Sequence, residues 1–167
     1  DNAMKNLFFK PLIFLTLLTL TGCLNSNPKR DYIGLEYLKV SQGLVDNGGW
    51  VVDLERDLVI SQIAKGKTRM LWLEQVYRDG NAIKYYKVLD VLVLPQIGKD
   101  ELLVGLMAMY NYQVDPRIIA IARYNAADQE RENLKVVKRA WKVDVRAKKI
   151  KPIKTEGIVC INEGYGI

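Results

Sequence analysis

Apolar and polar residues follow a strand-like pattern along most of the chain after residue 34. Short blocks rich in Val, Ile, Leu and aromatic residues are separated by stretches containing Gly, Asp, Asn or Pro. The expected strands are residues 37–45, 50–54, 58–64, 68–77, 83–94, 102–114, 117–124, 134–150 and 158–162. A helix over residues 36–44 is the main alternative to the first strand, because its leucines partly suit a helical period. Residues 126–133 fit either a short helix or a loop.

Four short stretches predict tight turns. They are DNGG at 46–49, KGK at 65–67, RDGN at 78–81 and the Asp-Pro pair at 115–116. Asn-Gly and Asp-Gly between apolar runs are typical of hairpins, because the turn needs a positive φ. The sequence therefore predicts a mainly β, single antiparallel domain over residues 34–167, curled as a sandwich or half-barrel with at most one or two short helices.

Residues 134–150 alternate most regularly and carry the densest positive charge. The chain has 25 Lys and Arg against 19 Asp and Glu, a formal net charge of +6. One predicted strand face carries the four candidate binding residues, Lys138, Lys142, Arg146 and Lys148, with neighbours about 6.7 Å apart where they alternate. Such a row could follow a polyanion, although Asp144 interrupts it. The alternative is an ordinary solvated strand face.

The first residues of the chain have the order of an export signal. Residues 1–3 precede Met4 and are set aside as a cloning remnant. Residues 4–22 then give two lysines, a short apolar centre and the small residues Thr21 and Gly22 before Cys23. The apolar centre is shorter than the roughly 20 residues that a membrane span needs. A buried helix is the alternative interpretation.

The tetrapeptide Leu20-Thr21-Gly22-Cys23 resembles the bacterial lipobox. The resemblance implies cleavage before Cys23, a diacylglycerol on its sulfur and a further acyl chain such as palmitate on the new amino terminus. Because Leu24 and not Asp follows, the sorting pattern resembles that of outer-membrane lipoproteins. Residues 23–33 are then a tether, and the expected location is the cell envelope, facing either the periplasm or the surface.

The absence of His removes Ser-His-Asp and Cys-His catalysis and the common zinc sites, so no cofactor or metal is expected. Gly66-Lys67-Thr68 lacks the earlier Gly of a phosphate-binding loop and is interpreted as a turn. Asp53, Glu55 and Asp57 leave a carboxylate-dependent hydrolase open as an alternative. Cys160 is expected to be a buried, inert thiol, with an intermolecular disulfide as the alternative.

Two segments resemble surface-adhesin protein E-like lipoproteins. The first is WVVDLERDLVISQIAKGKTRMLWLEQVY, matched at Trp50, Asp53, Gly66 and Trp72, and the second is KPIKTEGIVCIN, matched at Pro152 and Cys160. The resemblance implies a small antiparallel sheet domain with a helix, outer-membrane attachment and adhesion. Members often carry a second Cys where this chain has QVDPRII, so Cys160 lacks that partner.

These observations predict a lipid-anchored envelope protein whose non-catalytic, adhesin-like domain binds a macromolecule. The expected partners are the membrane, through the lipid, and a protein or polyanion; an exported basic patch does not favour nucleic acid. A lipocalin-like carrier of a small apolar ligand and an envelope hydrolase using Asp or Glu are the alternatives. The oligomeric state is left open.

Overall fold

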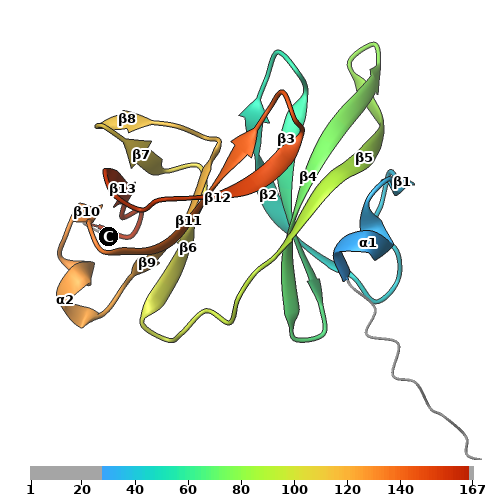
Figure 1. The fold of residues 1–167 in the computed structure, drawn as a ribbon. Coiled ribbons are helices and arrows are strands. Elements are labelled where there is room, and N and C mark those ends of the chain that lie inside the picture. Colours follow the sequence, from blue (N-terminus) through green and yellow to red (C-terminus); the bar gives the residue numbers. More distant parts are fainter. Residues whose placement is uncertain (1–27, 166–167) are drawn as a thin grey trace, which may run out of the picture.

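A computed structural model describes residues 28–165 of the chain (Figure 1). This part is mainly β, with antiparallel sheets, two short helices and no closed barrel, so the predicted fold class is confirmed. The strands are distributed over three sheets. The expected signal peptide over residues 4–22 and the expected lipidation residue Cys23 lie outside the described residues. Of the expected tether, residues 28–32 form helix α1 (Pro28–Tyr32), which packs against the first sheet.

The first sheet has five strands in the order β1-β5-β4-β3-β2. Their bounds are β1 (Glu36–Tyr37), β2 (Val45–Asp53), β3 (Leu58–Lys65), β4 (Thr68–Asp79) and β5 (Ala82–Val93). Two-residue turns join β3 to β4 and β4 to β5, and their glycines Gly66 and Gly80 have φ of 56° and 59°. The hairpins predicted at KGK and RDGN are therefore confirmed.

The hairpin predicted at DNGG is wrong. Residues 46–49 lie inside β2, where the register with β3 shifts between Asp46 and Gly49 and Gly48 has a φ of 85°. A Cβ on Gly49 would lie 1.9 Å from the carbonyl oxygen of Ile60, so the two backbones approach too closely for a side chain. The Asn-Gly pair serves a bulge in a continuing strand. Upstream, β1 has only two residues and no helix forms over 36–44.

The second and third sheets contain the rest of the strands. The second has the order β12-β11-β9-β6, with β6 (Glu101–Val104), β9 (Ile118–Arg123), β11 (Val137–Asp144) and β12 (Lys149–Ile153). The third has the order β10-β13-β7-β8, with β7 (Ala108–Tyr110), β8 (Gln113–Val114), β10 (Asn133–Leu134) and β13 (Ile158–Ile161). Helix α2 (Ala126–Gln129) is capped by the Asn125 side chain.

Two long predicted strands are divided in the structure. Residues 102–114 contribute to β6, β7 and β8, and Asn111 and Tyr112 turn the chain with φ of 50° and 64°. The strand predicted over 134–150 is broken after Asp144, whose side chain accepts hydrogen bonds from the backbone N–H groups of Arg146 and Ala147. These bonds stabilise the turn between β11 and β12, in which Lys148 has a φ of 53°.

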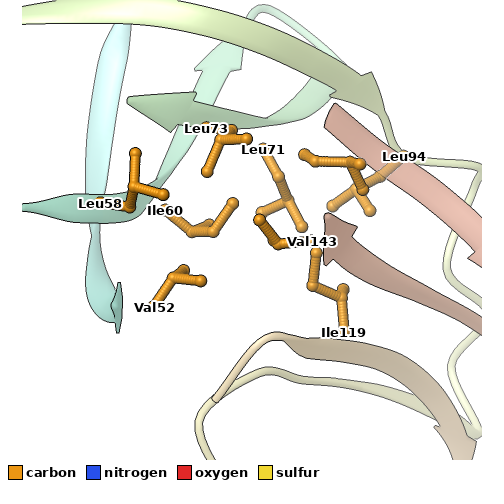
Figure 2. Packing of buried hydrophobic residues seen from close by; sticks show 9 residues of the cluster. Val52, Leu58, Ile60, Leu71, Leu73, Leu94, Ile119 and Val143 are labelled. Carbon is orange, nitrogen blue, oxygen red and sulfur yellow. The ribbon is translucent and has the colours of Figure 1, made fainter. Parts of the chain in front are cut away.

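The three sheets are stacked, with the second sheet in the middle (Figure 1). Between the first and second sheets, Leu58, Leu71 and Leu73 pack against Ile119 and Val143, all at most 2% exposed (Figure 2). On the other side of the second sheet, small residues of β9 pack against the third sheet, where Cys160 is fully buried. This two-sided burial explains why β9 is apolar on both faces.

The outer face of the first sheet is covered by the N-terminal segment. Tyr32, Tyr37, Val40 and Leu44 pack over a buried group that includes Trp72. The ring centroids of Tyr32 and Trp72 are 4.8 Å apart. The first sheet is therefore also covered on both sides, and α1 is part of the folded domain.

Glu74 of β4 is a fully buried acid under this cover. Its two carboxylate oxygens accept hydrogen bonds from the Tyr37 and Ser61 hydroxyls, each at 2.5 Å. Burial raises the pKa of Glu74, and the two hydroxyl hydrogen bonds oppose that effect without cancelling it. The buried charge is therefore satisfied in geometry but is still disfavoured by its surroundings.

We expect the free energy of unfolding to depend on pH because of the Glu74 charge. Glu74→Gln should remove this part of the pH dependence. Since the folded pKa of Glu74 is raised, the folded state binds more protons above the ordinary value of 4.5, and stability falls as pH rises through that window. Urea unfolding should therefore show the natural chain gaining stability relative to Glu74→Gln as pH is lowered. Glu55→Gln, at an exposed acid, is the control. A gap between the natural chain and Glu74→Gln that is constant with pH would contradict this account.

Candidate functional site

The four candidate binding residues do not form a row. Lys138 is the extra residue of a bulge between Val137 and Arg139, and it is exposed. Lys142 lies within β11, whereas Arg146 and Lys148 lie in the turn after that strand. The prediction of one cationic strand face is therefore wrong, because the strand bulges at one end and stops at Asp144.

Lys142 is engaged in an ion-pair cluster. Its Nζ lies 2.9 Å from Oδ2 of Asp115. The Asp115 carboxylate also accepts two hydrogen bonds from the Arg117 guanidinium, at 2.7 Å to Oδ1 and 2.8 Å to Oδ2. Burial acts to raise the pKa of Asp115, but the hydrogen bonds from Arg117 and Lys142 outweigh it and lower the pKa to about 2. Lys142 thus balances a local carboxylate and is less available to a partner.

Lys148 reaches back to the first sheet. Its Nζ donates a long hydrogen bond of 3.4 Å to Oε1 of Gln75 on β4. Gln75 lies opposite Lys87 of β5, and Tyr77 lies opposite Tyr85. Because residues two apart on a strand share a face, these side chains lie together beside the β11–β12 turn. We call this region the Tyr77 surface: it comprises Gln75, Tyr77, Tyr85, Lys87 and Lys148, together with Arg146 from the same turn as Lys148.

Tyr77 and Tyr85 form a stacked aromatic pair at this surface. Their ring centroids are 4.5 Å apart with an interplanar angle of 15°, and Tyr77 remains 38% exposed. A partly exposed stacked tyrosine pair offers apolar contact area, and tyrosine hydroxyls can also form hydrogen bonds. Such a pair suits a flat ligand group such as a sugar ring.

The cations around the tyrosine pair differ in their availability. Lys87 Nζ lies 2.8 Å from Oε1 of Glu36, and this hydrogen bond raises the pKa of Lys87. Arg146 and Lys148 are exposed, and neither forms an ion pair within residues 28–165. These two cations could bind carboxylate, sulfate or phosphate groups of a partner.

The tyrosines were missed by sequence reasoning, although a signal for them exists. The RDGN turn was predicted, and pairing the strands outward from it places Tyr77 near Tyr85. The contribution of Lys148 has no comparable local signal, since Gln75 is 73 positions away.

Two hollows of the described domain open to solvent. The hollow beside Trp50 and Gly105 has a volume of about 480 Å³, and its wall includes Leu106, which is 48% exposed. A second, of about 530 Å³, is lined by Tyr110 and Lys142, and Tyr110 is 48% exposed. The space between the sheets is filled by apolar side chains.

Two of the three acids considered in the sequence form salt bridges, and the thiol is buried. Asp53 forms a salt bridge with Arg56 at 2.7 Å, and Asp57 forms one with Arg78 at 3.0 Å. Cys160 is buried and free, as expected, and its burial raises the pKa of the thiol to about 12. Across residues 28–165, no three His, Cys, Asp or Glu side chains come together as a metal site.

Comparisons with known proteins do not assign the chain to a family. No protein-family model, no curated protein and no solved structure matches it. Within the described part, no helix combines the length and apolar character needed to cross a membrane.

Proposed function

We propose that the protein is a lipid-anchored component of the bacterial cell envelope, attached to the outer membrane through Cys23. Its β domain is a non-catalytic, adhesin-like module that binds an acidic macromolecule. The observation that carries the binding role is the Tyr77 surface, where a partly exposed stacked tyrosine pair lies beside Gln75, which Lys148 contacts, and Arg146 belongs to the same turn as Lys148. The anchor rests on the lipobox-like sequence that ends at Cys23.

The proposed acyl anchor and the positive charge of the chain both fit an envelope protein. A single acyl chain gives only marginal membrane binding, so the implied diacylglycerol and further acyl chain are what stable attachment requires. An excess of Lys and Arg favours acidic saccharides or acidic protein surfaces as partners. The carrier alternative has less support, because the hollows are open and the space between the sheets is filled. The hydrolase alternative has less support, because Asp53 and Asp57 are paired with arginines.

The anchor predicts a specific modification. Intact mass spectrometry of the protein from membranes should find a chain that begins at Cys23 and carries acyl groups. Cys23→Ala should abolish labelling by radioactive palmitate and leave residues 4–22 uncleaved, because both steps require the cysteine sulfur. Cys160→Ala should retain the label. Recovery of an unmodified chain, or full labelling of Cys23→Ala, would contradict the proposed anchor.

The Tyr77 surface predicts a site-specific loss of polyanion binding, with heparin as the probe. The double variant Arg146→Ala/Lys148→Ala should bind more weakly and should lower the slope of log affinity against log salt by about two, one for each lost contact. Tyr77→Ala should weaken binding with little change in that slope, because it removes stacking and not charge.

The control for this experiment removes the same charge elsewhere. Lys99 and Lys135 are exposed and lie outside the Tyr77 surface, so Lys99→Ala/Lys135→Ala should retain most of the affinity. Equal losses from the two double variants, measured by titration at several salt concentrations, would show that heparin responds to net charge and would contradict the proposed surface.

A further inference from the structure

We propose that the end of the first sheet formed by α1 and the β3–β4 turn lies against acidic lipid headgroups. The inference rests on the proposed lipid anchor at Cys23 and adds the face that the domain turns to the membrane. The surface consists of four exposed cations, Arg30, Lys65, Lys67 and Arg69, and we call it the cationic end.

The length of the chain between the anchor and the domain limits their separation. Five positions separate Cys23 from Pro28, the first residue of α1. A fully extended chain spans at most about 3.6 Å per residue, so the Cα of Pro28 lies within about 18 Å of the Cα of Cys23. The surface around the start of α1 is therefore held close to the bilayer.

Three contacts hold α1 and the residues just after it on the first sheet. Lys29 Nζ lies 3.1 Å from Oδ1 of the buried Asp90, and the Gly34 N–H donates to the Val88 carbonyl at 2.8 Å. Tyr32 packs on Trp72 inside the outer cover of the sheet. Because α1 is held in this way, the point where the tether enters determines which end of the domain is nearest to the membrane.

The β3–β4 turn adjoins α1 and adds its charges. Lys65 Nζ lies 5.9 Å from the centroid of the Tyr32 ring, so the turn and the helix form one surface. None of the four cations of the cationic end forms an ion pair within the described residues. Lys and Arg near an acidic bilayer each improve partitioning by about fivefold. The free charges thus fit an acidic lipid surface.

Exposed apolar residues accompany these cations. Ile33 directly follows α1 and is 39% exposed. Val45 and Val93 lie at the same end of the sheet, opposite Ala64 and Met70, and are 57% and 38% exposed. Apolar side chains beside cations are the combination that interfacial membrane contacts use.

This orientation separates the membrane from the Tyr77 surface. Strand β4 runs from Thr68 at the cationic end to Asp79, and its 12 residues span about 37 Å. The β3–β4 and β4–β5 turns lie at opposite ends of the sheet (Figure 1). The proposed binding surface, near the second turn, therefore points away from the lipid.

Lysine acetylation of the full lipidated protein on vesicles tests the orientation. Vesicles of phosphatidylcholine alone are compared with vesicles that also contain phosphatidylglycerol, and labelling rates are read by peptide mass spectrometry. In the acidic vesicles, Lys65 and Lys67 should react several-fold more slowly, whereas Lys148, at the Tyr77 surface, should react at the same rate in both. Equal rates at Lys65 and Lys67 in the two vesicles would overturn the proposal.

Co-sedimentation separates failure of the orientation from failure of the anchor. If the protein pellets with both vesicles but its lysines react equally, the anchor stands and the orientation is overturned. If it pellets with neither, the anchor fails and the orientation fails with it. Lys67→Glu should reduce the protection of Lys65, and the matched Lys135→Glu should not. Undiminished protection of Lys65 in Lys67→Glu would also contradict the role of the cationic end.

Discussion

The arrangement of the domain depends on one buried carboxylate, that of Asp90 on β5. One oxygen accepts a hydrogen bond from the Ile150 N–H at 2.8 Å, and the other lies 3.1 Å from Lys29 Nζ and 3.7 Å from Lys149 Nζ. A carboxylate with 1% exposure needs such partners, because an uncompensated buried charge is strongly destabilising. The requirement joins three distant segments, namely α1, the first sheet and the edge of the second sheet. The position of α1, and hence of the proposed anchor, follows from it.

Both faces of the first and second sheets are buried, so the groups that can bind a partner lie at the surface of the domain. The second sheet is covered by the first and third, and the first sheet is covered by the second sheet and the N-terminal segment. Apolar side chains therefore fill the layers, and the available chemistry lies at strand ends and turns. Two such places stand out at opposite ends of β4, namely the cationic end and the Tyr77 surface. Their chemistry suits a lipid surface and an acidic macromolecule, respectively.

Sequence reasoning succeeded where the information was local. The turns at 65–67 and 78–81 were predicted because each joins two strands directly through a positive-φ glycine. The same signal failed at 46–49, where the positive φ belongs to a bulge and a close approach to Ile60. The break after Asp144 was missed because the alternation of residue types continues through the turn. The Tyr77 surface could not be predicted as a whole, since the contact between Lys148 and Gln75 depends on how two sheets pack.

The most direct test of the account is the height of each end of the first sheet above the bilayer. Single dyes placed at Lys67→Cys and at Asn81→Cys can be compared by energy transfer to acceptors on lipid headgroups, because Cys160 is buried and Cys23 is the proposed acylation site. With the lipidated protein on acidic vesicles, we predict strong transfer from position 67 and weak transfer from position 81, because the two positions lie at opposite ends of β4, a strand about 37 Å long. Equal transfer from the two positions, or stronger transfer from position 81, would contradict the account.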